Sequence, residues 1–405
     1  MSLKKHSRNL LKLSALLCVN AWGFDNVDFP MDQQTASIKY YPMDSQSFKV
    51  FDGFTFTPTL NVGERFDDNY HQAEHNTKSS MITNVTPTFV LASNNGKSAY
   101  DLSYQANTDF FHSAPSENNT DHDIHGDAAY EFDARNRVRF DLGWKKETDT
   151  AGQQQHTESD KYTDAHAGTM YTYGARTARG QIEFAGDYDQ LRYQNSNGLN
   201  DSLERNTTAV RSTFYVGIAP KTRALIEARY ADFSYLSDTD LDSHNIALLG
   251  GLAWDLTSRT TGTIKIGEER KTFEHAEVKQ ATGSLWEVGA DYRPTQFSSF
   301  TVKARSAIDE GSDGASSIKT TSGQIGWDHE WLERLRTNVN YSKSDEQYQD
   351  IDRDDKLKGY GASVTYRARR WLDLGLSYTH AEDSSTAADE SYIRNIYAIN
   401  VTASL

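Results

Sequence analysis

The most constraining feature of this sequence is a period-two alternation of apolar and polar residues that returns in short runs along most of the chain. At 397–405 an apolar residue occupies every second position, and the same pattern recurs at 372–379, 300–305 and 137–145. Because successive side chains of a β-strand point to opposite faces, each run predicts a strand with one apolar and one polar face. A soluble β-sandwich has the same alternation, so no single run distinguishes a soluble sheet from a membrane one.

The spacing of the runs makes that distinction. Short turns recur every 36–45 residues, near positions 95, 136, 176, 221, 259, 295, 333 and 369. A longer polar stretch lies between successive short turns, as at 148–160, 194–203 and 347–355. Outer-membrane barrels have short periplasmic turns and longer extracellular loops, whereas a propeller or a solenoid has no consistently long loop class. The pattern predicts an all-β fold: a transmembrane antiparallel up-and-down β-barrel of about 18 strands, with 16 as the alternative.

Composition agrees with a barrel around water. The mean hydropathy of −0.72 and the hydrophobic content of 37% would by themselves suggest a very soluble or disordered chain. Aromatic residues make up 12% of the chain and only 7 prolines occur, which opposes disorder. A barrel needs lipid-facing residues only at alternate positions. The net charge of −15 argues against a nucleic-acid partner, because no basic stripe is present to neutralise phosphates.

The N-terminus predicts export. Basic residues from Lys4 to Lys12 accompany an apolar run at 10–19, and Val19-Asn20-Ala21 offers a small-residue cleavage site. Residues 1–23 therefore read as a secretory signal peptide, too short to span a bilayer. The only cysteine, Cys18, lies inside this segment, which excludes a disulfide or a thiolate site in the mature chain.

Two further segments follow the signal peptide. Residues 24–52 show neither helical nor strand periodicity and are interpreted as a periplasmic lead-in, with a plug or a partner-binding segment as alternatives. Residues 53–405 form the predicted outer-membrane barrel. Pro58 and Pro87 fall inside its first two strands, where a proline removes a ladder hydrogen bond and a bulge is expected.

Aromatic residues gather near the predicted strand ends, which is typical of the two interfacial girdles of a barrel. Ordinary cross-strand pairing is the alternative explanation. The residues beside short turns are Trp254, Phe297, Trp331 and Trp371, and those beside long loops are Phe66, Phe110, Tyr193, Phe233, Tyr235 and Phe273.

A short motif, Phe66-Asp67-Asp68-Asn69-Tyr70, stands at the end of the first predicted strand. It resembles the aromatic-Asp-Asp-Asn motif of the β-barrel porin 2 family, whose members are associated with exopolysaccharide biosynthesis and export. The resemblance implies an outer-membrane barrel that contacts a polysaccharide chain and works beside a periplasmic polysaccharide-export protein. It implies no catalytic residues. We expect the motif to order the first external loop through side-chain to backbone bonds, with ligand contact as the alternative.

No other motif predicts chemistry. His329-Glu330 begins like a zinc-protease motif but lacks the second histidine. The alternating aspartates at 238–242 and 350–354 lack the glycine and glutamate of a calcium loop. We therefore predict no catalytic, metal-binding or cofactor-binding residues, and a protein that is not an enzyme.

The charged residues on the non-lipid face of the alternation are predicted to line the lumen. Eighteen strands leave an aqueous pore, and charges of both signs would keep it wet. The alternative is that these residues pair across strands and fill space, and for most of them we expect both. These residues are Asp101, Glu131, Asp133, Arg137, Arg139, Asp141, Glu183, Asp187, Glu227, Arg229, Lys265, Glu287, Asp291, Lys303 and Arg305.

Three functions are compatible with this reading. The first is a conduit or assembly factor for an exported exopolysaccharide or capsular polysaccharide, acting without covalent chemistry. The second is a general solute-diffusion porin, and the third is a barrel enzyme that acts on outer-membrane lipid. Porins commonly fold one long loop inward, and no predicted external loop clearly exceeds the others, which favours the conduit over the porin.

Overall fold

The computed structural model describes residues 47–51, 53–150, 159–198, 200–257 and 259–404. The predicted signal peptide and all of the lead-in before residue 47 lie outside these ranges.

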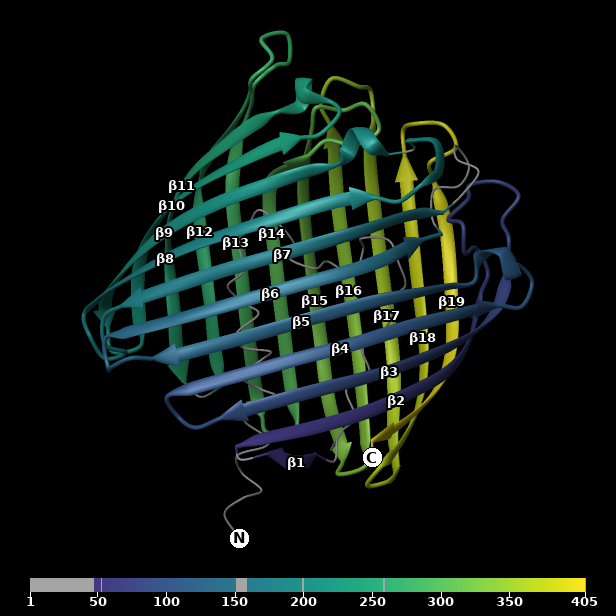
Figure 1. The fold of residues 1–405 in the computed structure, drawn as a ribbon, viewed down its shortest axis with the longest axis horizontal. Coiled ribbons are helices and arrows are strands. Elements are labelled where there is room, and N and C mark those ends of the chain that lie inside the picture. The colour runs from purple at the N-terminus through teal and green to yellow at the C-terminus, as the bar shows by residue number, and fades with distance from the viewer. Residues whose placement is uncertain (1–46, 52, 151–158, 199, 258, 405) are drawn as a thin grey trace.

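Eighteen antiparallel strands, β2 to β19, form a closed barrel (Figure 1). Each strand pairs with its neighbour in the chain, and the last pairs with the first, from Ile396↔Asp67 to Ser404↔Thr59. Closure satisfies every strand edge, as a sheet that crosses lipid requires. The strands are β2 Phe54–Asp67, β3 Ser80–Asn94, β4 Ser98–Phe111, β5 Asn119–Glu131, β6 Asn136–Asp149, β7 Asp160–Tyr173, β8 Gly180–Tyr193, β9 Arg205–Ala219, β10 Thr222–Tyr235, β11 Ser243–Thr257, β12 Thr260–Phe273, β13 Ala281–Thr295, β14 Ser298–Glu310, β15 Ser317–Leu332, β16 Leu335–Tyr348, β17 Asp354–Arg369, β18 Leu372–Ser385 and β19 Tyr392–Ser404.

The connections alternate in length as the sequence predicts. The turns at one end include 95–97, 220–221 and 333–334, whereas the loops at the other end include 68–79 and 194–204. By the rule for outer-membrane barrels, the short turns are periplasmic and the longer loops extracellular. The helical segments of the described residues are single 3-10 turns, and none is long and apolar enough to cross a membrane.

The outer face of the barrel is apolar. Leu142, Ile226, Leu248, Ile266 and Ile399 each leave about half or more of their surface exposed there. A soluble protein would bury such residues, so their regular exposure around the ring identifies the face that meets hydrocarbon. Aromatic residues close to the periplasmic turns are exposed as predicted: Phe297, Trp331 and Trp371.

The extracellular girdle differs from the prediction. Phe66 and Phe110 are exposed on the outer face, but Phe233, Tyr235 and Phe273 are buried. Tyr193 also occupies an inner-face position, opposite Tyr162. We assigned these residues to the girdle by their distance from a loop. The direction of a side chain, however, depends on whether its position along the strand is odd or even.

The barrel wall opens between β13 and β14 near its extracellular end, while β14 stays paired with β15 as far as Glu310↔Ser317. The ladder between β13 and β14 ends at Trp286↔Ser306, although β13 continues to Ala281 and β14 to Glu310. The side chain of Ile308 lies against Gly283, and the Ile308 amide donates to Glu269 Oε1 on β12 at 2.7 Å. The end of β14 therefore passes behind β13 on the inside of the barrel.

Three smaller predictions need correction or extension. A short strand, β1 Phe48–Phe51, lies within the predicted lead-in and pairs with β2. Neither proline produces a bulge, since β2 and β3 keep one register from Phe54↔Ser93 to Asp67↔Ser80. Pro87 instead interrupts the ladder between β3 and β4, and Pro58 lies just beyond the last β2 residue that pairs with β19.

Candidate functional site: the lumen and the closing seam

The structure places the predicted lumenal charges as follows. All of them except Asp133 lie on the inner face, because cross-strand pairs such as Lys265↔Glu287 and Asp101↔Asp127 share one face around the ring. Asp133 lies instead in the periplasmic turn 132–135, where it accepts hydrogen bonds from the Arg135 and Asn136 amides. These bonds lower the pKa of Asp133.

The inner face of β9 to β13 is packed rather than open. The Arg229 side chain is fully buried, and it donates to Glu227 at 2.6 Å and to Glu287 at 2.6 and 2.9 Å. Lys265 contacts both carboxylates, at 3.1 and 3.4 Å, and Thr213 donates to Glu227. The four charges neutralise one another, so this part of the wall is a structural network rather than a free charged surface.

Above this network lies an apolar cluster inside the barrel. Phe233, Leu249 and Leu285 are buried there, with Ala307 on the inward end of β14. Glu310, at the end of the same strand, accepts a hydrogen bond from Tyr235 at 2.6 Å and forms an ion pair with the buried Lys271. This sector of the lumen is therefore packed rather than open. The inward end of β14 fills it.

The inner face of β4 to β8 is acidic. Carboxylates outnumber lysines and arginines there. The basic residues are Arg137, Arg139 and Lys145, and the aspartates and glutamates on the same face are several times as numerous. Arg139 pairs with Asp127 at 2.6 Å, and His125 contacts the same carboxylate at 2.8 Å. The carboxylates on this wall are Asp101, Asp109, Asp121, Asp123, Asp127, Glu131, Asp141, Glu147, Asp149, Asp160, Asp164, Glu183, Asp187 and Asp189.

The inner face of β15 to β19 is different again, and we call its central part the uncharged strip. Between the charged residues at the strand ends, every described inner-face residue is uncharged, and most carry a hydroxyl or an amide. Such groups donate and accept hydrogen bonds without attracting counter-ions. The strip includes Thr320, Ser322, Gln324, Asn338, Asn340, Ser342, Ser344, Ser363, Thr365, Ser377, Thr379, Asn400 and Thr402.

The Phe66–Tyr70 motif lies at the seam where the barrel closes. Asp67 is fully buried at the end of β2, and Arg394 on β19 donates to it at 2.5 and 3.0 Å. Asp68 accepts from the Asn395 amide at 2.6 Å and from its side chain at 2.7 Å. The two aspartates therefore tie the first strand of the barrel to the last.

The rest of the motif orders the first external loop. The Asn69 amide donates to Asp67 at 3.1 Å, and the Asn69 side chain exchanges hydrogen bonds with Ala73 at 2.8 and 2.9 Å. Tyr70 is buried against Ile82 and Phe111. This agrees with the structural role expected for the motif.

A family profile described as "Putative beta-barrel porin 2" matches residues 51–405. The chain belongs to this family. The match covers the whole described barrel, so the protein is a porin-type barrel of the bacterial outer membrane. No curated protein matches the sequence significantly.

Several solved structures are similar to this chain at very low sequence identity. OccK2 (OpdF) of Pseudomonas aeruginosa is 9% identical, with 88% of this chain and 99% of that chain covered and a TM-score of 0.48. OccK3 (OpdO) of the same organism is 10% identical over 86% and 95% of the two chains, with a TM-score of 0.44. The siderophore receptor PirA of P. aeruginosa is 10% identical over 86% and 80%, also with a TM-score of 0.44.

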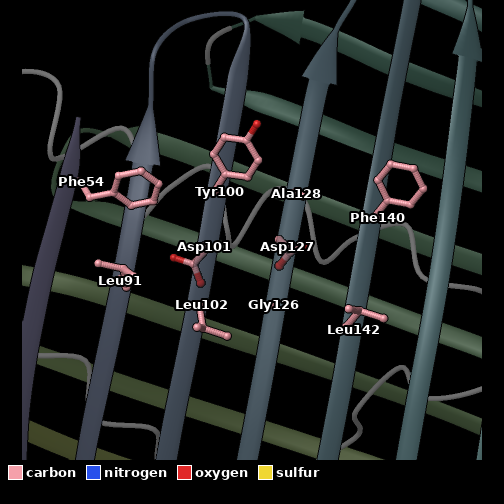
Figure 2. Close-up of a pocket in the computed structure, with 10 residues that line it drawn as sticks. All are labelled: Phe54, Leu91, Tyr100, Asp101, Leu102, Gly126, Asp127, Ala128, Phe140 and Leu142. Atoms are coloured by element: carbon pink, nitrogen blue, oxygen red, sulfur yellow. The ribbon is translucent and has the colours of Figure 1, made fainter. Parts of the chain in front are cut away.

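A groove on the outer face of this porin-family barrel is lined mainly by apolar side chains. Figure 2 shows it over β5, where Gly126 lies between Leu102 and Leu142 of the adjacent strands. Its volume is about 390 Å³, and bulky apolar side chains such as Tyr100 and Phe140 surround it. Because it faces hydrocarbon, it is a surface for lipid chains and lies outside the lumen.

Two functional features of this family member escaped the sequence prediction. The uncharged strip was missed because only charged residues were sought on the inner face, although the same parity identifies the neutral ones. Arg394, the partner of Asp67, was missed because the two residues are 327 positions apart and the alternation does not give the register in which the last strand pairs with the first.

Proposed function

We propose that this outer-membrane porin is a conduit for an exported polysaccharide, and that the polymer it passes is uncharged. The uncharged strip carries this proposal. A sugar chain presents hydroxyl groups, and the partly exposed side-chain amides of the strip, on Gln324, Asn338, Asn340 and Asn400, offer them exchangeable hydrogen bonds, whereas most hydroxyl groups of the strip are buried. No covalent step is needed, and we propose none. A periplasmic polysaccharide-export protein remains the partner implied by the family.

The charge of the opposite wall supports an uncharged polymer. The excess of carboxylates on β4 to β8 repels anions across the lumen. A uronic-acid or sulfated chain would meet this repulsion at every residue, whereas a neutral chain would not. A neutral chain also has no charge with which to bind the wall tightly, so it is free to move on.

The solute-diffusion porin is the second candidate, and one observation favours it. The inward end of β14, anchored by Glu310 to Lys271 and Tyr235, narrows the lumen as an inward-folded loop does in porins. The sequence prediction counted loop length against this function, but here the inward element is a strand end and not a long loop. Both candidates allow ion conductance, so conductance alone does not separate them.

Export of the polymer separates them. We would delete the gene in its own host, restore it on a plasmid, and measure surface polysaccharide together with uptake of small sugars. The conduit predicts loss of surface polymer with normal uptake. Retained polymer with reduced uptake would refute the conduit and support the solute porin.

A matched pair of variants tests the strip itself. Asn340→Trp places a large side chain in the strip, whereas Tyr341→Trp makes a similar change at the next residue, on the outer face of the same strand. We expect the first to reduce polymer export at least tenfold and the second to leave it unchanged. Heat-shifted migration in a detergent gel would confirm that both barrels fold. Equal export by the two variants would contradict the strip as the path.

A further inference from the structure

The inner face of β6, β7 and β8 brings three potential metal ligands together. Asp141 on β6 and Asp187 on β8 both lie opposite Gly168 on β7. His166 is the next inner-face residue of β7 toward the extracellular end. One ligand atom from each of Asp141, His166 and Asp187 lies within 4.8 Å of the other two. We propose that these three residues bind a divalent transition-metal ion of the Zn²⁺ type in the wall of the lumen.

Gly168 creates the space for this arrangement. A Cβ atom at position 168 would lie 2.3 Å from Asp141 Oδ2. The absence of a side chain on the central strand therefore lets Asp141 fold across β7 toward His166 and Asp187. Any other residue would push the carboxylate away.

His166 is oriented as a metal ligand would be. Its Nδ1 atom lies 2.5 Å from Asp189 Oδ1, so the ring is fixed by a carboxylate on β8. Its Nε2 atom points to the other side, 2.5 Å from Asp141 Oδ2 and 4.0 Å from Asp187 Oδ1. A carboxylate on one ring nitrogen and a metal on the other is the common arrangement of histidine ligands.

Asp187 gives a second, independent indication of a ligand. Its side chain is 8% exposed, and its Oδ2 atom has no hydrogen-bond partner among the described residues. A buried carboxylate oxygen without a partner costs free energy unless a ligand occupies it. A protonated His166 that bridges Asp141 and Asp189 would satisfy those two aspartates, but it would leave this oxygen unpaired.

The donor set defines the class of ion. One imidazole and two carboxylates suit Zn²⁺, with metal–ligand distances of about 2.0–2.2 Å and a water molecule as fourth ligand. Ligand atoms around a tetrahedral ion of that size lie about 3.4 Å apart. The distance from Nε2 to Asp141 Oδ2 would open by about an ångström. The Asp187 oxygen nearest to Nε2 is Oδ1, at 4.0 Å, so the Asp187 carboxylate would turn to present its unpaired Oδ2 atom to the ion.

The test uses the full-length protein, purified in detergent without a polyhistidine tag and stripped with a chelator. Titration with ZnCl₂ by calorimetry should show one high-affinity ion per barrel. His166→Ala and Asp187→Asn should each weaken binding at least tenfold, and Gly168→Ala should do so without removing a ligand. Asp189→Asn should weaken it about 10- to 100-fold, as loss of a ring-orienting carboxylate does. His125→Ala, at another histidine–aspartate pair of the same wall, is the matched control and should not change binding.

Two results would overturn the proposal. One is the absence of Zn²⁺ binding to the wild-type barrel. The other is binding that survives both His166→Ala and Asp187→Asn, which would assign the ion to another site such as Glu74, His75 and Asp389 in the external loops. X-ray absorption at the zinc edge of the wild-type protein needs no variant, and it should show a single imidazole nitrogen at about 2.0–2.1 Å. A spectrum without imidazole would also refute the site.

Discussion

The ion pair between Asp67 and Arg394 should dominate the stability of the closing seam. Replacing Asp67 with Asn removes one charge and leaves the Arg394 guanidinium, only 6% exposed, without its hydrogen-bonded counter-charge. Breaking a buried pair in this way costs about 3–5 kcal/mol. That corresponds to roughly two to four orders of magnitude in the ratio of folded to unfolded barrel.

Urea unfolding in lipid vesicles, followed by tryptophan fluorescence, measures this cost. We expect Asp67→Asn to lower the midpoint by about 1 M or more. Arg176→Gln is the control, because Arg176 pairs with Glu131 at a periplasmic turn with its side chain 76% exposed, and an exposed pair contributes about 1 kcal/mol or less. The double variant Asp67→Leu with Arg394→Met removes both charges and should recover most of the loss. The reasoning fails if Asp67→Asn unfolds at the same urea concentration as Arg176→Gln.

Three further outcomes follow from the lumen and the loops. Arg229→Met leaves Glu227 and Glu287 without their main counter-charge. The free energy of unfolding in urea should therefore fall by about 3–5 kcal/mol. An unchanged urea midpoint would refute the stabilising role of this network. Lys271→Ala removes the ion pair with Glu310 at the inward end of β14. The single-channel conductance in planar bilayers should therefore rise. A conductance equal to that of the wild type would show that this end does not narrow the lumen. Burial lowers the pKa of His71 in the first external loop below its unfolded value of about 6.5. The neutral form of His71 therefore stabilises the folded loop above a pH of about 6.5. This stability is lost as the pH falls through the lower pKa of the folded state. The protection factors of the amides in loop 68–79, measured by hydrogen exchange, should therefore fall on acidification in the wild type but not in His71→Gln.

The barrel could be predicted from the sequence because lipid leaves few alternatives. Period-two runs, separated by alternating short and long connections, specify both strand direction and closure once every backbone group must be paired. The same parity placed Glu227 and Arg229 on the inner face. It did not show which charges neutralise them, since Glu227 contacts Lys265 on β12 and Arg229 contacts Glu287 on β13, and neither strand is a neighbour of β10.

Other features depend on where the wall departs from regularity. The inward end of β14 has no sequence marker, because Ile308 continues the same alternation as Val302 although the ladder with β13 has already ended at Ser306. Pairing with β15 continues to Glu310. Phe233 was therefore assigned to a membrane girdle, although it packs inside the barrel. The candidate metal site was missed for a related reason. Its ligands come from three strands, and Gly168, which brings them together, is inconspicuous in the sequence.

If the uncharged strip provides the path for a neutral sugar chain, a chain that enters the strip should interrupt the ion current through the barrel. Single-channel recording of the purified wild-type barrel measures this, with neutral glucan oligosaccharides and carboxylated oligosaccharides of equal length added in turn to the periplasmic side. We expect frequent current interruptions with the neutral chains and few with the carboxylated ones. Interruptions by the carboxylated chains alone, or by neither, would contradict this path.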